Sequence, residues 1–409
     1  MFIEKIDSQI TKLIRREEKR QEETLDLIAS ENYPSKAVSE ALSSIFVAKY
    51  AEGRPYKRYY GGMENIDKLE TLVEERVRKV FKLDSKKWSV NVQALSGAPA
   101  NYEILRSLLT LHDKMLCLHL PHGGHLSQGS KASLTGHDFK PVYYYLDKNG
   151  FLDYKEIEKL AIKEKPKLII CGYTAYPRKV DFKKFSQIAK KVGAYLLADT
   201  SHITGLIIGG VHPSPFPWAD VVMTTTHKTL RGPRGAIIIC KKELEKKIFP
   251  KVFPGMQGGP HEHTICAIGV ALGEAMSPKF KKYAAQIVKN AKALAAELKK
   301  YNFDLVSGGT DNHLVLIDLR NKNITGKPTQ ELLEKAGIVT NRNTIPYDPR
   351  TPYDPSGIRL GTPALTTRGM KEKEMKKIAF WINEVISSPK SVPKIKKEVK
   401  KLCQQFPIP

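Results

Sequence analysis

The chain has 409 residues, 41% of them apolar, and its lysines and arginines outnumber its acids by 67 to 43, which gives a net charge of +24. This length allows two to three domains with a large core. No apolar run approaches the roughly 20 residues of a membrane span, and the N-terminus is amphipathic without an apolar signal core. The composition therefore excludes a membrane-spanning chain and predicts a cytoplasmic globular protein.

Hydrophobic periodicity predicts alternating helices and strands along the chain. Apolar residues at helical spacing mark helices near residues 3–14, 69–80 and 182–189. A helix between consecutive strands is a βαβ pattern, so we expect an α/β fold with a mostly parallel sheet and helices on both faces. The strands expected are the short apolar runs Lys167–Cys171, Tyr195–Ala198, Val221–Met223 and Ala236–Cys240.

A smaller α/β domain is expected after this sheet. A long helix over about residues 281–301 leads into it, followed by a strand at Leu314–Leu319 and a helix at Met370–Ile386. The expected division is an N-terminal helical arm (1–50), a large domain (51–278) and a small C-terminal domain (279–409).

Cysteine spacing and charge limit the classes of partner. The five cysteines stand singly, with neither metal-binding nor disulfide spacing, so we expect no metal. Lysine clusters at 185–191, 241–251, 279–300 and 389–401 are most simply solvated helix faces, and they would also steer anionic substrates. Nucleic-acid binding is not expected as the main function, because neither a stripe of stacking aromatics nor a known module accompanies the charge.

The segment 224–235, TTTHKTLRGPRG, contains the most informative lysine. Lys228 follows the apolar run Val221–Met223, where a buried lysine is costly without a purpose. One purpose is a Schiff base with a carbonyl, because burial and nearby cations lower the pKa of the amine and make it nucleophilic. A solvated loop lysine is the alternative, and the neighbouring motifs decide between the two.

Two further segments support the first interpretation. Asp199 directly follows a short apolar run, with His202 three residues on, and α/β folds place site chemistry at the carboxyl ends of parallel strands. Pyridoxal phosphate needs a carboxylate against its ring nitrogen, although a helix N-cap is the alternative role for an aspartate. The turn at 95–101, LSGAPAN, precedes a helical pattern and would present free N–H groups to a phosphate. Together the three segments indicate this cofactor.

These residues belong to a wider pattern that resembles the serine hydroxymethyltransferase family, pyridoxal-phosphate enzymes of fold type I. Eight blocks in the family's order, from about Leu27 to Gly369, carry the resemblance. They are LIASEN (27–32), YAEGRPYKRYYGG (50–62), NVQALSGAPAN (91–101), LPHGGHLSQGS (120–130), DTSHITGL (199–206), TTTHKTLRGPRG (224–235), FPGMQGGP (253–260) and SGIRLGTPALTTRG (356–369).

The resemblance implies how the cofactor is held. Lys228 would bind it as a Schiff base until serine takes its place in an external aldimine, and Asp199 would face the pyridine nitrogen. His125 would stack on the ring, although a turn histidine is the simpler interpretation of its residues alone, and His202 would reach the ring hydroxyl or the substrate. Further cofactor contacts would be Ser96, Gly97, Ala98, Thr174 and Tyr50, with Gly258 and Gly259 from a partner subunit, so the site would be shared across a homodimer or a tetramer of two dimers.

The resemblance also implies substrate and catalytic residues. Arg359 would grip the serine carboxylate, since its planar fork makes two parallel hydrogen bonds, and Ser30 would assist; a surface charge is the alternative for this arginine. Glu52, among tyrosines that include Tyr60, is the candidate acid/base with a pKa suited to proton transfer, and the competing carboxylate Glu31 is expected to be structural. Thr225 and His227 would act beside Lys228.

The implied reaction is the reversible transfer of the hydroxymethyl carbon of serine to tetrahydrofolate, giving glycine and 5,10-methylenetetrahydrofolate. The Cα–Cβ bond would break in retro-aldol fashion, or the folate nitrogen would attack Cβ directly. The folate contacts that the resemblance implies are Leu120, Gly124, His125, Leu126, Phe253, Asn343, Thr351, Pro352 and Tyr353, with Glu52 and Tyr60 from the other subunit.

Three positions depart from the family pattern. Ala98 replaces a common hydroxyl residue, Met256 stands where a glycine is expected, and Tyr347 occupies a position where a small polar residue is usual. Because Tyr347 falls near the pterin, transfer to a modified pterin such as tetrahydromethanopterin stays open.

Two rival functions stay open as well. One is a pyridoxal-phosphate threonine or serine aldolase or aminotransferase, which needs no pterin site, and the second is a basic RNA-binding scaffold without enzyme activity.

Overall fold

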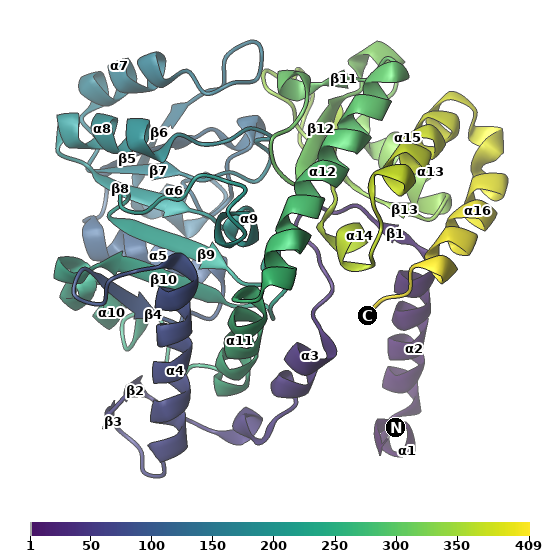
Figure 1. The fold of residues 1–409 in the computed structure, drawn as a ribbon. Helices are drawn as coiled ribbons and strands as arrows, with labels where there is room; N and C mark the ends of the chain where they lie inside the picture. The colour runs from purple at the N-terminus through teal and green to yellow at the C-terminus, as the bar shows by residue number, and fades with distance from the viewer. Residues whose placement is uncertain (1) are drawn as a thin grey trace.

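The structure, a computed structural model, describes residues 2–409 and is organised round a seven-stranded sheet (Figure 1). Its strands are β4 (Trp88–Asn91), β5 (Lys114–Leu118), β6 (Lys140–Tyr144), β7 (Leu168–Cys171), β8 (Tyr195–Asp199), β9 (Val221–Thr225) and β10 (Ala236–Lys241). They lie in the order β4-β10-β9-β8-β7-β5-β6. The pairs from β9 to β6 are parallel, whereas β10 runs antiparallel to β4 and β9. The carboxyl ends of the parallel strands therefore meet at one edge.

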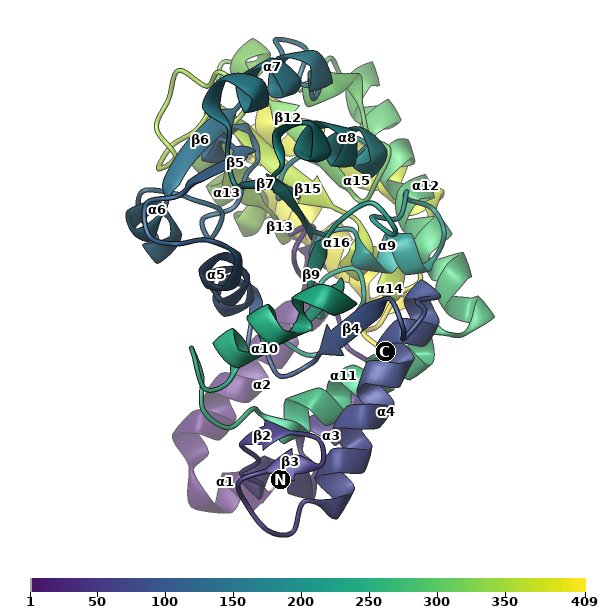
Figure 2. The same ribbon diagram turned by 90° about the vertical axis from the view of Figure 1, so that its left-hand side faces the viewer.

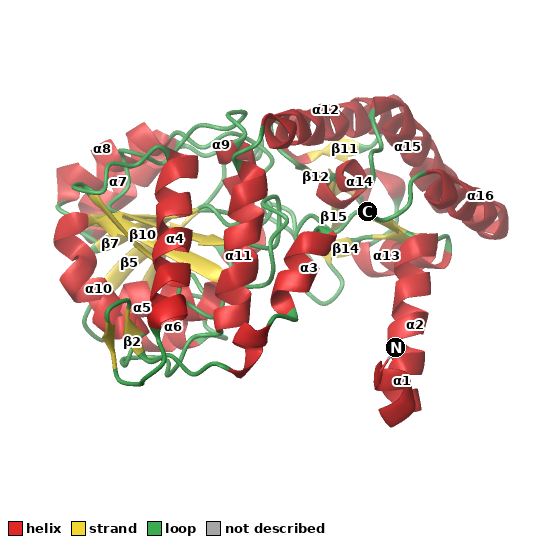
Figure 3. Cartoon of the chain, turned by 60° about the horizontal axis from the view of Figure 1, so that its bottom comes forward, coloured by secondary structure: helices red, strands yellow, loops and turns green. Residues whose placement is uncertain are grey.

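Helices cover both faces of this sheet, as Figure 3 shows. One face carries α5 (Gly97–Leu108), α6 (Leu134–Asp138) and α10 (Glu245–Val252), and α5 and α10 lie side by side in Figure 2. The other face carries α4 (Glu64–Phe81), α7 (Tyr154–Glu164), α8 (Phe182–Val192), α9 (Thr204–Ile208) and α11 (Glu262–Ala275). Alternate strand residues point to opposite faces. Leu196 and Ala198 of β8 therefore pack with the second group and Leu197 with the first, which is why the strands are continuous apolar runs.

A second, four-stranded antiparallel sheet forms the C-terminal part. Its order is β11-β12-β15-β14, with β11 (Asp304–Leu305), β12 (Leu314–Asp318), β14 (Asn341–Asn343) and β15 (Gly357–Gly361). The helices around it are α12 (Pro278–Lys300), α13 (Gly326–Lys335), α14 (Pro363–Thr367), α15 (Glu372–Ser387) and α16 (Val392–Gln405). Residues from the N-terminal arm join this core, because β1 (Leu25–Asp26) pairs with β13 (Ile338–Val339) and buries Leu25 and Leu27 there.

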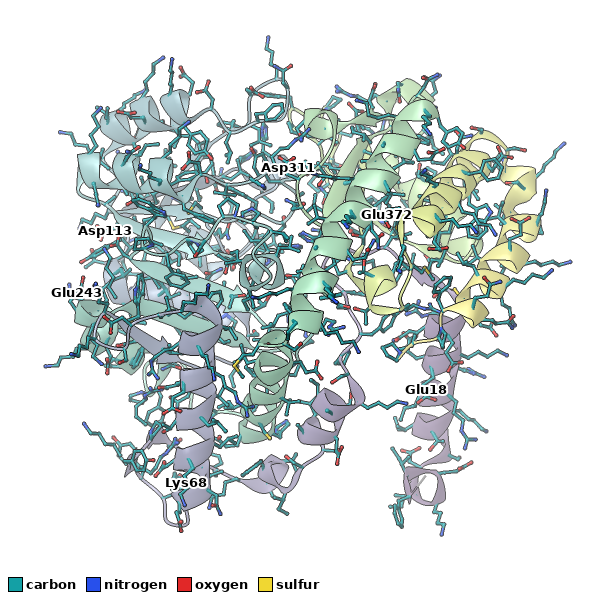
Figure 4. The ribbon with its side chains drawn as sticks, in the orientation of Figure 1. Glu18, Lys68, Asp113, Glu243, Asp311 and Glu372 are labelled. Atoms are coloured by element: carbon teal, nitrogen blue, oxygen red, sulfur yellow. The ribbon has the colours of Figure 1, made fainter. Side chains whose placement is uncertain are left out.

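The N-terminal helices extend away from both sheets. In Figure 1, α1 (Phe2–Ile6) and α2 (Ser8–Glu23) project from the body, and Glu18 is labelled on α2 in Figure 4. Phe2, Ile6 and Leu13 on these helices are 89%, 87% and 58% exposed. Nearer the large sheet, α3 (Lys36–Leu42) packs on α11, and β2 (Gly53–Arg54) pairs with β3 (Lys57–Arg58) in a short hairpin. The apolar faces of α1 and α2 are thus uncovered within one chain.

The expected α/β class and most of the expected elements are confirmed, but the helix expected near residues 3–14 is divided at Asp7, whose side chain caps α2 by accepting from the N–H groups of Gln9 and Ile10. Each expected strand of the large sheet is present, and the strands after residues 194, 220 and 235 run one or two residues further than the apolar runs suggested. The long helix begins earlier than expected, at Pro278, because the side chain of Ser277 caps it by accepting from the N–H of Phe280. No helix among residues 2–409 combines the length and apolar character needed to cross a membrane.

Replacing Trp381 tests the C-terminal core. Trp381 is fully buried, and its Nε1 donates to Glu398 Oε2 at 2.8 Å. We expect Trp381→Ala to lower the free energy of unfolding by about 3–5 kcal/mol through the cavity that it leaves. The neighbouring Phe380 is 42% exposed, so Phe380→Ala should change it by only about 0.5 kcal/mol. Urea unfolding measures both, and equal losses would contradict the assignment of Trp381 to the core.

Candidate active site

A cavity of about 320 Å³ lies at the carboxyl ends of β8 and β9. This is the edge at which open α/β sheets bind ligands. Most of the residues predicted for the site from the sequence line it. They are Ser30, Ser96, Gly97, Ala98, His125, Thr174, Asp199, His202, Thr225, His227 and Lys228.

Lys228 projects into this cavity from the turn that follows β9. Its Nζ donates to Thr225 Oγ1 at 2.9 Å, and its backbone carbonyl accepts from Asn32 Nδ2 at 2.8 Å. Burial lowers the pKa of the amine to about 8; Asp199 opposes this shift, and Arg359 and Arg234 add to it. A buried amine with a lowered pKa is partly neutral near pH 8 and can act as a nucleophile. The solvated-lysine alternative is therefore wrong.

Asp199 is the last residue of β8 and is held by four hydrogen bonds. Asn101 Nδ2 and Gln128 Nε2 donate to its Oδ2 at 3.1 and 2.8 Å. The N–H and hydroxyl of Ser201 donate to Oδ1 at 3.1 and 2.6 Å. The helix-cap alternative is wrong, because α9 begins at Thr204 and its N-cap is Ile203. The carboxylate is instead fixed in the cavity that Lys228 also lines.

The amino end of α5 closes one side of the cavity. Ser96 is the N-cap, and its side chain makes no capping hydrogen bond. The first N–H groups of a helix lack partners within the helix, and the helix dipole favours an anion there. A Cβ at Gly97 would lie 2.7 Å from Thr225 Cγ2, so only glycine fits at this turn. Gly97 and Ala98 are thus suited to hold a phosphate.

Arg359 approaches the cavity wall from the other sheet, in the middle of β15, and does not itself line the cavity of Lys228. It is only 8% exposed, and burial lowers the pKa of its guanidinium to about 10. Nε donates to Asn341 Oδ1 at 3.1 Å and Nη1 to the Thr174 carbonyl at 2.6 Å. It forms no salt bridge with the carboxylates of residues 2–409. The surface-charge alternative is wrong, and a buried cation bound only to neutral acceptors favours an anionic ligand.

Three histidines surround the charged groups. Burial lowers the pKa of His125 and His202, and it lowers that of His227 to about 3. His125 Nδ1 accepts the N–H of Ser127 at 3.1 Å. His202 Nδ1 lies 3.1 Å from Nε2 of His313. The rings are therefore neutral in the ligand-free protein and fixed through Nδ1 in two of the three cases.

A second group of predicted residues lies apart from the cavity. Tyr50 donates to Glu52 Oε1 at 3.4 Å, and its ring centroid is 5.3 Å from that of Tyr60. A Cβ at Gly258 would be 3.2 Å from Glu52 Oε1, and one at Gly259 would touch the Tyr50 ring. Phe253 joins this group through Tyr59, with ring centroids 5.8 Å apart. None of these residues lines the cavity of Lys228.

The remaining residues predicted to bind folate, in the loops 120–126, 343 and 351–353, do not line the cavity, apart from His125. Thr174 Oγ1, at the cavity wall, donates to the Gly124 carbonyl at 2.7 Å. Thr344, after Asn343, donates to the Pro121 carbonyl at 2.9 Å and so joins this loop to the end of β14. Leu120 begins the 3₁₀ turn η2 (Leu120–His122), and Leu126 is exposed. Thr351, Pro352 and Tyr353 lie farther out, on an exposed loop.

Two of the unusual positions also have defined places. Tyr347 has a left-handed backbone (φ 56°), its hydroxyl donates to the Leu146 carbonyl at 2.9 Å, and its ring packs on His122. Met256 is exposed beyond α10. Glu31 lies near the buried Asp26, whose pKa is raised to about 7 by burial and by the charge of Glu31. Glu31 does not line the cavity of Lys228.

Sequence reasoning missed several polar residues around Asp199 and Arg359. Asn101 and Gln128 belong to blocks that resemble the family, but their partner Asp199 lies 98 and 71 residues away, so spacing gave no signal. Ser201 had a weak signal, because it comes two residues after Asp199. Asn341 orients Arg359 across the strand pair β14–β15. His313 lies directly before β12, in a segment where no sequence motif indicated a role.

The reactivity of Lys228 should rise with pH at a lower pH than that of an exposed lysine, because burial lowers the pKa of its amine. The pKa falls from 10.5 to about 8 on folding, so we expect acylation of Lys228 in the ligand-free protein to rise with a midpoint near pH 8. The unfolded amine keeps its proton up to a higher pH than the folded one. The free energy of unfolding should therefore rise as the pH increases from about 8 to 10.5. Arg359→Gln should move the midpoint upward, since the charge of Arg359 lowers it. Peptide mass spectrometry measures the modification, and a midpoint near 10.5 would contradict the account.

Comparison with known proteins agrees with this geometry. The family model described as serine hydroxymethyltransferase matches residues 3–382. A curated protein named serine hydroxymethyltransferase, from Desulfotalea psychrophila (strain LSv54 / DSM 12343), is 52% identical over 406 residues, which are 98% of this chain and 95% of that protein. The half-buried lysine, the aspartate at the strand end and the buried arginine thus occur in a chain that belongs to the serine hydroxymethyltransferase family.

Proposed function

We propose that this protein transfers the hydroxymethyl carbon of serine reversibly to tetrahydrofolate, forming glycine and 5,10-methylenetetrahydrofolate. Family membership supports this activity. The observation that carries the proposal is the cavity in which a half-buried Lys228, Asp199 and the amino end of α5 face one another. An amine, a carboxylate and a phosphate-binding turn are the three contacts that pyridoxal phosphate requires.

The residues around the cavity fit this cofactor. The side-chain oxygens of Asn101 and Gln128 are buried without partners beside the Asp199 carboxylate. Such acceptors suit a protonated ring nitrogen, and Asp199 would hold it. Lys228 would bind the carbonyl carbon, and Ser96, Gly97 and Ala98 would bind the phosphate. When bound, pyridoxal phosphate supplies an electron sink for the negative charge that develops on Cα of the substrate.

The remaining side chains would bind and orient serine. Arg359 would pair with its carboxylate, replacing water by charge-assisted hydrogen bonds in a low-dielectric site, and Ser30 would bind the same group. His125 would pack on the ring, whereas Thr174 and Thr225 would fix the positions of Arg359 and Lys228 through the hydrogen bonds described above. Tetrahydrofolate would enter along the loop of Leu120, Gly124 and Leu126 and past Asn343 and the 351–353 loop.

Glu52 is the proposed group that holds the proton of the serine hydroxyl, with Tyr50 and Tyr60 around it. Within one chain this cluster lies apart from the Lys228 cavity. We therefore propose a homodimer in which Tyr50, Glu52, Tyr60, Phe253, Gly258 and Gly259 complete the cavity of the second copy. The large exposed apolar side chains Phe2, Ile6, Ile45, Val47, Tyr56 and Tyr59 support such an interface.

Other features of the proposal follow from the same family assignment. The arm (1–50), large domain (51–278) and small domain (279–409) are the proposed units, although Leu25 and Leu27 pack in the C-terminal core. We propose a cytoplasmic enzyme whose basic surface steers anionic substrates and whose main partners are serine, glycine and reduced folate.

Substitutions at Lys228 and Arg359 test the proposed activity. In an assay of methylenetetrahydrofolate formed from serine, Lys228→Ala should abolish measurable turnover, and Lys246→Ala, at a lysine outside the cavity, should not change it. Arg359→Lys should raise the KM for serine by about tenfold or more, because one of two charge-assisted hydrogen bonds, worth about 1.5–3 kcal/mol, is lost. Full turnover by the Lys228→Ala protein would refute the proposal.

Mixing two inactive variants tests the shared site. In a heterodimer of Lys228→Ala and Glu52→Gln chains, one site takes Lys228 from one chain and Glu52 from the other. We expect such mixtures, after reversible dissociation, to recover activity that neither variant has alone. If each site were built within a single chain, mixing would restore nothing.

A further inference from the structure

The turn that presents Lys228 is held by a residue of the N-terminal arm. Asn32, in the loop between β1 and α3, donates through Nδ2 to the Lys228 carbonyl at 2.8 Å and to the hydroxyl of Tyr283 in α12 at 2.7 Å. Its Oδ1 accepts from the hydroxyl of Thr367, the last residue of α14, at 2.7 Å and from the N–H of Tyr33 at 2.9 Å. An asparagine amide has two donor and two acceptor positions, so Asn32 uses all of them at this junction.

The chemistry of two partners fixes the orientation of the Asn32 amide. The carbonyl of Lys228 can only accept, so the amide nitrogen must face it. The backbone N–H of Tyr33 can only donate, so the amide oxygen must lie on that side. The direction of the hydrogen bond from Asn32 to the main chain of Lys228 therefore follows from the positions of backbone groups.

The turn itself contains a backbone conformation that needs outside support. The Lys228 carbonyl also accepts from the N–H of Arg231 at 3.1 Å, and Arg231 has a left-handed backbone (φ 63°). A residue other than glycine keeps this conformation only where its surroundings enforce it. The guanidinium carbon of Arg231 lies 4.2 Å from the ring centroid of Tyr283, and Nη2 lies 3.8 Å from Glu274 Oε2. Tyr283 thus contacts one end of the turn through its ring and Asn32 through its hydroxyl.

We propose that Asn32 is a positioning residue that holds the main chain of Lys228 so that its Nζ stays in the cavity. On the side of the large sheet, Thr229 Oγ1 donates to the His202 carbonyl at 3.0 Å and holds only the next residue of the turn. The arm, α12 and α14 meet at Asn32, so the position of Lys228 depends on them as well as on β9.

The consequence for the cofactor rests on the proposed function, whereas the hold on Lys228 does not. In that function the neutral Nζ of Lys228 attacks the aldehyde carbon of pyridoxal phosphate. A C=N bond replaces the C=O bond, and both amine protons leave with the oxygen as water. An amine that is already oriented toward this carbon forms the bond at a lower entropic cost. Asn32 acts on this step only through the main chain of Lys228.

Two ligands separate the positioning of Lys228 from the integrity of the cavity. Pyridoxal phosphate forms a bond with the amine, whereas pyridoxine phosphate has an alcohol in place of the aldehyde and binds without one. We expect Asn32→Leu to raise the Kd of pyridoxal phosphate about tenfold, the scale of one lost hydrogen bond. The Kd of pyridoxine phosphate should stay within about twofold of the wild-type value. Visible absorbance measures the first and calorimetry the second, and equal changes in both Kd values, or no change in either, would overturn the proposal.

Asn290 offers a matched control in the same region. Its Nδ2 donates to Thr366 Oγ1 and to the Met370 carbonyl, each at 2.9 Å, and none of these groups touches the turn of Lys228. Asn290→Leu therefore removes a comparable set of buried hydrogen bonds and should lower the free energy of unfolding. Both Kd values should keep their wild-type values in this variant. A selective loss of pyridoxal phosphate binding in Asn290→Leu would show that any disturbance of the junction has this effect and would overturn the proposal.

Two adjacent threonines give a milder version of the same comparison. Thr367→Val removes only the hydroxyl that donates to Asn32 Oδ1, and Thr366→Val removes only the one that accepts from Asn290. We expect Thr367→Val to weaken pyridoxal phosphate binding selectively, by less than Asn32→Leu does, and Thr366→Val to leave it unchanged. This pair decides the proposal if the leucine variant does not fold, and equal binding by the two valine variants would contradict it.

Acylation of Lys228 in the ligand-free protein separates this inference from the proposed function. A wild-type protein that does not bind pyridoxal phosphate would refute the proposed function, and the acylation result would still decide the role of Asn32. We expect Asn32→Leu to move the midpoint of acylation upward from about pH 8 toward 10.5, because an amine that leaves the cavity regains water. Asn290→Leu should keep the wild-type midpoint. An unchanged midpoint in both Asn32→Leu and Thr367→Val would overturn the proposal.

Discussion

The site depends on the burial of Lys228 and Asp199 in one cavity and of Arg359, which donates to the carbonyl of Thr174 in the wall of that cavity. Burial lowers the pKa of the Lys228 amine to about 8 and that of the Arg359 guanidinium to about 10. Asp199 is already bound by four donors, and Arg359 by two neutral acceptors. The cavity and its border therefore retain positive charge that favours the binding of anions. A cofactor phosphate and an amino-acid carboxylate meet that requirement, and the amino end of α5 adds to it.

Docking of the two sheets brings Arg359 and His313 against residues that line the cavity. Asp199 and Lys228 come from the seven-stranded sheet, whereas Arg359 and His313 come from the four-stranded one. The sheets are joined by Arg359 to the Thr174 carbonyl, by Asn312 to the Tyr176 carbonyl and by Thr310 to the Pro177 carbonyl at 3.1 Å. Each bond connects a residue in or just before a strand of the small sheet to the loop after β7. Any motion between the two parts would therefore change both substrate binding and the contact between His202 and His313.

The sequence allowed the large sheet and the lining of the cavity to be predicted, but not its contacts. Continuous apolar runs indicated the strands because both faces of the sheet are covered, and the residues after β8 and β9 were correctly expected to meet at one edge. Partners far apart in the chain, such as Asn101 and Gln128 with Asp199, required the fold. The separation of Glu52 and Tyr60 from Lys228 also has no local signal, because it depends on how the chain folds back along α4 and α11. The domain boundaries and the shared site remain predictions.

The most direct test is the visible absorbance of the protein with pyridoxal phosphate, followed by glycine and then tetrahydrofolate. The account predicts a visible band with the cofactor that Lys228→Ala lacks. It also predicts a red-shifted band with glycine that grows strongly when the folate is added. A protein that stays colourless with pyridoxal phosphate, or one whose spectrum ignores tetrahydrofolate, would contradict the account.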